Sequence, residues 1–264
     1  PARRAAFTAV VSIGCIPLFY GMPVAHLDRV RIVLVETSLA ANIGAAARAM
    51  LTMGLTRLVL VSPRHFPHAD ATALAAGATQ VLADAHVVAT LDDALAGSAT
   101  AIALTARPRR YAGRVLALRD AAREAVQRAA EADVALVFGT EMSGLTNAQV
   151  LRCTDVATIA ANPQYASLNL AAAVQLACWE LRMATQGGDV APARRFAAAT
   201  HDDVEALYVH AERTLAALRF YDPARPRRLM TRLRRLFART ALEHEEVNIL
   251  QGILARIDDA CQRR

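Results

Sequence analysis

Residues 134–139 read Val-Ala-Leu-Val-Phe-Gly, an uninterrupted apolar run that stops at a glycine. A short run of this kind, closed by a turn residue, is typical of a strand buried on both faces. Similar runs predict further strands at 30–35, 58–61, 99–104 and 156–159. Between them, helical patterns cover 41–53, 70–77, 92–96, 119–131 and 168–183. Strands that alternate with helices predict an α/β fold, with a mostly parallel sheet and helices on both of its faces.

The pattern changes after Gly187 and Gly188, which begin a segment that also contains Pro192. Such composition predicts a linker, placed at residues 187–200. Beyond it the periodicity is helical only, at 202–220, 225–239 and 243–259. We therefore expect an α/β domain over residues 26–186 and an all-α C-terminal extension over residues 201–264.

Residues 1–25 precede the first predicted strand. Arg3 and Arg4 stand before an apolar stretch that superficially resembles an export signal. The stretch is too short to span a bilayer comfortably. We interpret these residues as an N-terminal extension, translated from an upstream start site and disordered or artefactual. An export signal and an added functional tail are the alternatives.

The composition favours an anionic partner. The formal charge is +6, and the sequence has no lysine, so that arginine accounts for all 30 basic residues. A GC-rich coding bias explains the missing lysine, although guanidinium groups also suit phosphate contacts. The four cysteines are scattered, without CxxC spacing or nearby histidines. This pattern argues against a metal site or a disulfide framework, and it fits a reducing cytoplasm.

Three polar or glycine-containing breaks each follow a predicted strand. They are Asn42-Ile43-Gly44 with Arg48, the turn 139–145 around Glu141, and Ser167-Leu168-Asn169. Each has an ordinary explanation alone, as a helix cap, a tight turn or a packing glycine. Their ordered conjunction favours a ligand site, because α/β proteins bind ligands at the carboxyl ends of parallel strands.

Helical geometry sets a condition on the first break. Asn42 and Arg48 would stand about 600° apart on one helix and would face different directions. Asn42 can therefore act together with Arg48 only if it lies in the loop or cap at the start of the helix. Gly44, Gly139 and Gly144 would allow a ligand to approach the backbone closely. No GxGxxG follows the first strand, which counts against a nicotinamide-dependent oxidoreductase.

The three breaks, in this order and spacing, resemble the three motifs of the SpoU branch of the SPOUT methyltransferases. More narrowly, Leu34–Ser38, Asn162–Tyr165 and the arginine-rich run 222–237 resemble the TrmJ-like group of bacterial tRNA methyltransferases. The resemblance covers about residues 29–255, which is nearly everything after the N-terminal extension.

This resemblance implies a trefoil knot in the last part of the α/β domain, a homodimer, and a site completed across the dimer interface. It also implies methylation of a ribose 2′-hydroxyl by S-adenosylmethionine, with nucleotide 32 of the tRNA anticodon loop as target, either cytidine or uridine. No metal and no membrane are expected. A non-catalytic tRNA-binding relic and an enzyme acting on rRNA are the alternatives.

The resemblance also implies roles for individual residues. S-adenosylmethionine would contact Leu104, Thr105, Ala106, Gly139, Ile159, Ala166, Ser167 and Leu168. Arg48 would be the central catalytic residue, assisted by Asn42, Glu141, Ser167 and Asn169. Because arginine stays protonated, we expect Arg48 to hold a substrate phosphate and stabilise developing charge, not to act as a base.

Two basic segments are candidates for RNA contacts. The first is the loop with Arg107, Arg109, Arg110 and Arg114. The second is a helical stripe of Arg228, Arg232, Arg235 and Arg239, beside an apolar stripe of leucines and Phe237. A solvated basic face is the alternative for the second segment. Trp179 is expected in the core or at the dimer interface.

Overall fold

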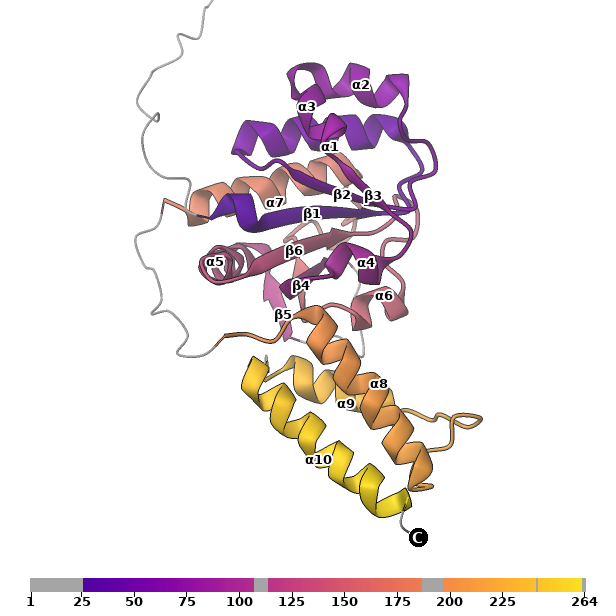
Figure 1. Cartoon of the computed structure of the whole chain (residues 1–264). Helices are drawn as coiled ribbons and strands as arrows, with labels where there is room; N and C mark the ends of the chain where they lie inside the picture. Colours follow the sequence, from indigo (N-terminus) through magenta and orange to yellow (C-terminus); the bar gives the residue numbers. More distant parts are fainter. Residues whose placement is uncertain (1–25, 107–113, 187–196, 241, 263–264) are drawn as a thin grey trace, which may run out of the picture.

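The structure, a computed structural model, describes residues 26–106, 114–186, 197–240 and 242–262. Its centre is a seven-stranded sheet of order β3-β2-β1-β6-β4-β7-β5, in which every pair of neighbouring strands is parallel (Figure 1). The strands are β1 Val30–Val35, β2 Arg57–Val61, β3 His86–Val88, β4 Ser98–Leu104, β5 Arg114–Ala117, β6 Asp133–Phe138 and β7 Asp155–Thr158.

Helices cover both faces of this sheet, as predicted (Figure 1). They are α1 Ala40–Met53, α2 Ala69–Ala75, α3 Thr79–Ala83, α4 Leu91–Leu95, α5 Leu118–Ala129, α6 Asn147–Leu151 and α7 Leu170–Ala184, with short 3₁₀ turns at Leu27–Arg29 and Ala76–Ala78. The predicted α/β class is therefore confirmed.

Strand β1 shows why the strands appear in the sequence as continuous runs of apolar residues. Ile32 and Leu34 belong to a core that they share with α1, α5 and α7. Val33 and Val35 belong to a second core with α4 and α6, on the other face. Successive side chains of a strand alternate between faces, so a strand covered on both sides must be apolar throughout.

Two strands and the short helix α3 lie outside the predicted elements, whereas α6 follows a Thr146 cap, as the ordinary explanation of the turn 139–145 predicts. Strand β3 has only three residues and begins at His86, so its apolar run is too short to be recognised as a strand in the sequence. Strand β5 is an edge strand that begins at Arg114, a residue predicted to lie in a basic loop. Helices α3 and α6 have five residues each, about one turn and a half.

The strand order places a topological switch beside β1. The chain moves from β1 to β2 and β3 on one side, and β4 to β7 lie on the other. Ligands bind at such switches, beyond the carboxyl ends of the strands. The knot stays a prediction, because residues 107–113, which connect β4 to β5, lie outside the described residues.

Three further helices form a separate layer beside the α4–α6 side of the sheet (Figure 1). They are α8 His201–Ala217, α9 Leu229–Ala238 and α10 His244–Gln262, called the helical unit below. Leu207 and Val247 are at the centre of their small core. Helix α9 begins four residues later than predicted, after Arg227, whose φ of 44° is left-handed.

The predicted division of the chain at residues 26, 187 and 201 stays a prediction. The N-terminal extension and most of the predicted linker lie outside the described residues. Helix α8 does begin at His201, after a capping box formed by Thr200 and Asp203. Within the described part of the chain, no helix has both the length and the apolar character needed to cross a membrane.

Candidate active site

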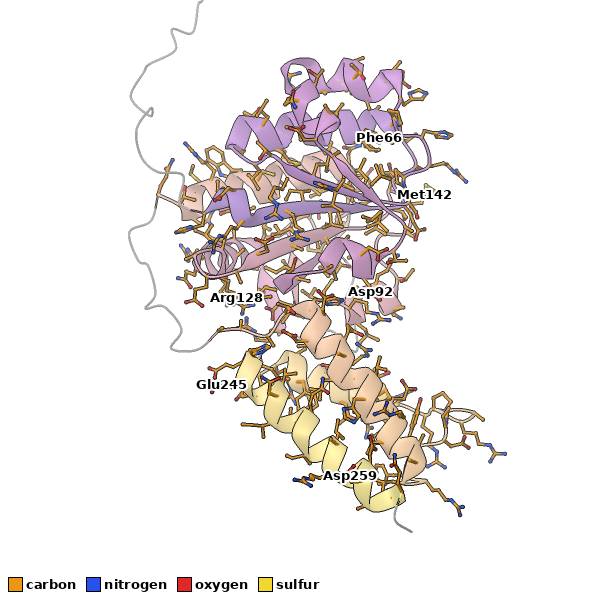
Figure 2. All side chains as sticks on the ribbon, in the orientation of Figure 1. Phe66, Asp92, Arg128, Met142, Glu245 and Asp259 are labelled. Carbon is orange, nitrogen blue, oxygen red and sulfur yellow. The ribbon has the colours of Figure 1, made fainter. Side chains whose placement is uncertain are left out.

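A cavity of about 310 Å³ opens at the carboxyl ends of β4, β6 and β7. All eight residues predicted to contact S-adenosylmethionine line it: Leu104, Thr105, Ala106, Gly139, Ile159, Ala166, Ser167 and Leu168. The lining also includes Met142, which is 90% exposed on the rim (Figure 2). The size is at the lower end of the range for sites that hold a small organic cofactor.

Glu141 leaves the β6–α6 loop and reaches the beginning of α1. Its Oε2 accepts hydrogen bonds from the backbone nitrogen of Ser38 at 3.0 Å and from the Ser38 hydroxyl at 2.9 Å. Its Oε1 accepts from the Leu39 nitrogen at 3.1 Å and from Nδ2 of Asn42 at 3.0 Å. The N-cap residue Leu39 cannot cap α1 with its own side chain, so a carboxylate from a distant loop does so.

These donors keep Glu141 ionised. Burial alone would raise the pKa of its carboxyl, but the hydrogen bonds from Asn42, Ser38 and Leu39 outweigh burial and lower the pKa to about 2. An anion with four donors is a poor proton acceptor near neutral pH. Its contacts instead fix the position of Asn42.

Asn42 is also hydrogen-bonded to Asn169. Its Oδ1 accepts a hydrogen bond from Nδ2 of Asn169 at 3.1 Å. Asn169 caps α7, because its Oδ1 accepts from the Ala171 nitrogen at 2.9 Å. The alternative explanation of Ser167 as the helix cap is therefore wrong, and Ser167 lines the cavity. One residue from each of the three predicted motifs thus belongs to a single hydrogen-bonded chain.

The condition for Asn42 to act together with Arg48 in one chain is not met. Asn42 is the third residue of α1 and is buried, whereas Arg48 is exposed on the same helix. The two therefore face different directions, as the helical geometry requires. Among the described residues, the Arg48 side chain forms no hydrogen bond or ion pair that would direct it to this cavity.

The glycines of the first two motifs are needed for protein packing. A Cβ atom at Gly44 would lie 2.0 Å from the backbone oxygen of Ala71, because α2 crosses α1 there. The expectation of a ligand at Gly44 is therefore replaced by its alternative, a packing glycine. A Cβ atom at Gly139 would meet Gly144 and Leu145 at 2.2 Å, within the same turn. Only Gly144, with φ of 66°, uses the left-handed region.

The predicted RNA-binding arginines have different environments. Arg107, Arg109 and Arg110 lie outside the described residues, so their role stays a prediction. Arg114 donates to Asp155 at 3.0 Å and to Glu124, and these two hydrogen bonds raise the pKa of its guanidinium. This pairing weakens the case that Arg114 contacts RNA. The stripe Arg228, Arg232, Arg235 and Arg239 is exposed along α9 and its two caps.

Sequence reasoning missed the contribution of Ser38 to this site. Its only local signal is a hydroxyl residue just before a predicted helix, which suggests an ordinary cap. Phe138, Thr140 and Ser143 also line the cavity; they belong to the second motif, but the sequence assigned them no role. Trp179 is 46% exposed, so of its two predicted places the core is wrong.

Comparison with known proteins identifies the family. The model of the SpoU rRNA Methylase family matches residues 29–179, which is over half of the chain. The chain belongs to the SpoU methylase family. A second model, that of the tRNA methyltransferase TrmJ C-terminal domain, matches residues 202–264. Membership of the SpoU family removes the oxidoreductase alternative.

Relatives within the SpoU family are similar over most of the chain. The tRNA (cytidine/uridine/adenosine-2′-O-)-methyltransferase TrmJ of Pseudomonas aeruginosa is 47% identical, over 86% of this chain and 93% of the relative. The tRNA (cytidine/uridine-2′-O-)-methyltransferase TrmJ of Escherichia coli K12 is 47% identical, over 88% and 96%. The crystal structure of TrmJ from Zymomonas mobilis (Z. mobilis ZM4) aligns with a TM-score of 0.77 at 33% identity, over 86% of this chain and 98% of that one.

Proposed function

We propose that this SpoU-family chain methylates a ribose 2′-hydroxyl in tRNA, at nucleotide 32 of the anticodon loop, with S-adenosylmethionine as methyl donor. The observation that carries the proposal is the hydrogen-bonded chain of Asn42, Glu141 and Asn169, which joins the three motifs beside a cavity lined by residues of the second and third. The tRNA substrate follows from the TrmJ relatives, which match both parts of the chain. The position of the nucleotide follows from the resemblance to TrmJ-like enzymes.

The residues of the cavity fit the proposed donor. Leu104, Ile159 and Leu168 offer apolar contacts, and the turn 139–144 brings backbone groups to the same space. When bound, S-adenosylmethionine supplies an electrophilic methyl group on a sulfonium ion. Such pockets combine mostly apolar walls with a few well-placed polar groups.

The reaction needs little more than alignment and charge stabilisation. The ribose oxygen forms a bond to the methyl carbon, the carbon–sulfur bond breaks with its electron pair left on sulfur, and the hydroxyl proton passes to a substrate phosphate or to water. Holding the reactants in line can supply about 7–11 kcal/mol. Asn42, Glu141 and Asn169 would contribute by holding the cavity wall rigid through their hydrogen bonds.

Arg48 would act in the partner's cavity in a homodimer. Its side chain is exposed on α1 and faces away from Asn42. Leu176 and Trp179 are also exposed on α7, which packs against α1, and they would be covered by the second copy. There Arg48 would hold a substrate phosphate and stabilise the developing oxyanion.

A direct test is methyl transfer to tRNA in vitro. The protein would be incubated with tRNA transcripts and S-adenosylmethionine carrying a labelled methyl group, and the label would be mapped by nuclease digestion and mass spectrometry. A matched transcript with 2′-deoxyribose at nucleotide 32 should accept no label. Label at another nucleotide, or in rRNA fragments only, would contradict the proposed substrate. A relic would fail to bind the donor in calorimetry.

A further inference from the structure

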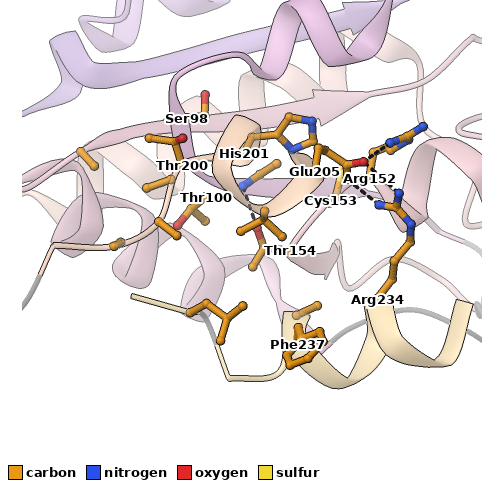
Figure 3. A pocket seen from close by; sticks show the side chains of 18 of the residues that line it. Ser98, Thr100, Arg152, Cys153, Thr154, Thr200, His201, Glu205, Arg234 and Phe237 are labelled. Atoms are coloured by element: carbon orange, nitrogen blue, oxygen red, sulfur yellow. Dashed lines mark hydrogen bonds and ion pairs between the residues drawn. The ribbon is translucent and has the colours of Figure 1, made fainter. Parts of the chain in front are cut away.

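The junction between the helical unit and the α/β part contains a charged cluster (Figure 3), beside apolar side chains and a hydrogen bond from the Gly97 nitrogen to Asp202. At the centre of the cluster is Glu205 of α8, whose side chain is 19% exposed. Glu205 accepts a hydrogen bond from Nη2 of Arg234 at 2.8 Å and forms a second bond with Nη1 of the same guanidinium. Its Oε2 also accepts from Nη1 of Arg152. One carboxylate therefore binds an arginine from each part of the molecule.

The two arginines belong to different parts of the molecule, Arg152 to the α/β part and Arg234 to the helical unit. Arg152 is the C-cap of α6, the helix that directly follows the loop of Glu141, and it also lies 3.6 Å from Asp92. Arg234 belongs to α9, and its guanidinium lies 4.3 Å from the centre of the Tyr208 ring. Asp92 receives a further contact from His201 of α8 at 3.3 Å. The cluster thus links α6, which follows the loop of Glu141, to the arginine-rich helix α9.

Helix α9 has two distinct faces around this contact. Arg234 and Phe237 are partly buried on the inner face, toward Tyr208. Arg232, Arg235 and Arg239 are exposed on the outer face. Because Arg234 is adjacent to Arg235 in sequence, fixing its guanidinium also fixes the direction in which the outer arginines project.

A partly buried carboxylate between two guanidinium groups is suited to orientation more than to stability. Desolvation offsets much of the attraction in such pairs, whereas a forked guanidinium–carboxylate contact permits only a narrow range of geometries. Burial would raise the pKa of the Glu205 carboxyl, but the hydrogen bond from Arg234 and the charge of Arg152 outweigh it and hold the pKa below its usual value. Glu205 is therefore ionised at neutral pH.

We infer that Glu205 is a positioning residue for the RNA substrate, which sets the direction of the α9 arginine stripe relative to the cofactor cavity. The inference rests on the proposed function, because a substrate must reach both places. A tRNA that contacts the stripe would then meet the cavity with its ribose already aligned. Without Glu205, Arg234 would lose its carboxylate partner and Arg152 would keep only Asp92, so α9 would be held less tightly against the α/β part.

The experiment compares Glu205→Gln with Glu245→Gln in the full-length protein. Glu245 is an exposed glutamate of α10 outside the junction, so it controls for the loss of one negative charge (Figure 2). We expect Glu205→Gln to raise KM for tRNA and the tRNA Kd about tenfold, the size of one lost charge-assisted contact. The expected kcat at saturating tRNA and the calorimetric Kd for S-adenosylmethionine are those of the wild type.

A second arm separates positioning from a general loss of stability. In a protein that carries Arg232→Gln, Arg235→Gln and Arg239→Gln, the substitution Glu205→Gln should have little further effect on the tRNA Kd, because only Arg228 of the stripe remains. Full additivity in this background, or an unchanged KM in the Glu205→Gln protein, would overturn the inference. Should Glu205→Gln fail to fold, Arg152→Gln cuts the same link from the α/β side, with the same expected outcomes.

Failure of the proposed function and failure of the inference about Glu205 would give different results, because the first is measured by methyl transfer and the second by tRNA binding. A wild-type protein that binds tRNA but transfers no methyl group to it would refute the proposed function. The tRNA Kd of the Glu205→Gln protein would still decide whether Glu205 orients the stripe.

Discussion

The side-chain nitrogen Nδ2 of Asn42 lies 3.0 Å from Oε1 of Glu141, although the two residues are 99 positions apart in the chain. This contact joins the start of α1 to the loop after β6. Asn42 also accepts a hydrogen bond from the side chain of Asn169, which caps α7, so the position of Asn169 depends on that of Asn42. The wall of the proposed cofactor cavity is therefore held by a chain of side-chain contacts, and its rigidity depends on one ionised carboxylate.

Replacing that carboxylate should weaken both the fold and the reaction. In Glu141→Gln, an NH₂ group would face donors from Ser38, Leu39 or Asn42, so at least one of these would lose its partner. We expect unfolding to become easier by about 1–3 kcal/mol. The kcat for methyl transfer should fall at least about tenfold, because Asn42 and Asn169 would lose their fixed position. Urea unfolding and initial rates measure the two effects, with Glu245→Gln as control, and equal rates would refute the role assigned to Glu141.

The same carboxyl predicts a defined pH dependence of stability. Its pKa is lowered to about 2 in the folded protein, below the ordinary value of 4.5. A lowered folded-state pKa means that the contribution is complete above about pH 4.5 and is lost as the pH falls toward 2. The difference in unfolding free energy between the wild type and Glu141→Gln should therefore be constant from pH 5 to pH 8. It should shrink below pH 4.5, and a difference that grows there would contradict the assignment.

Local patterns predicted five of the seven strands in the described sheet, and the family resemblance supplied the cavity lining, but neither gave the direction of every side chain. Strands β1 and β6 can be recognised in the sequence as continuous apolar runs, because both faces of the sheet are buried. The bounds of α1 agree with the predicted helix to within one residue, but its cap comes from Glu141, a long-range partner that no local pattern reveals. Glu205 carries no sequence signal at all, since an isolated glutamate in a helix is normally solvated.

Gly44 should tolerate no side chain. In Gly44→Ala the new Cβ atom would lie 2.0 Å from the Ala71 backbone oxygen, so α1 and α2 must separate. Overpacking of this kind costs about 1–3 kcal/mol and sometimes more. Gly252→Ala is the matched control, because nothing lies within 4 Å of that position in α10 and alanine favours a helix by up to about 1 kcal/mol. Thermal unfolding should move in opposite directions for the two proteins, and two equal shifts would contradict the crowding at Gly44.

The arginine stripe should make tRNA binding strongly dependent on salt. Each phosphate contact contributes about 0.7–0.9 to the slope of log Kd against log salt concentration. The triple substitution Arg232→Gln, Arg235→Gln and Arg239→Gln should therefore reduce that slope by about 2 to 3. Arg256→Gln, at an exposed arginine of α10 whose side chain is 85% exposed, should leave the slope unchanged. Filter binding at several salt concentrations measures it, and an unaltered slope in the triple variant would place the stripe outside the RNA interface.

A mixture of two inactive proteins should recover activity if Arg48 serves the partner's cavity. Arg48→Ala and Asn169→Ala would each inactivate both sites of their own homodimer. In a mixed dimer, the cavity of the Arg48→Ala chain keeps its own Asn169 and receives Arg48 from the partner. Co-refolding equal amounts should therefore restore about a quarter of the wild-type kcat, because half of the dimers are mixed and each has one intact site of two. If Arg48 acted within its own chain, each cavity of the mixed dimer would lack one residue, and no methyl transfer would return.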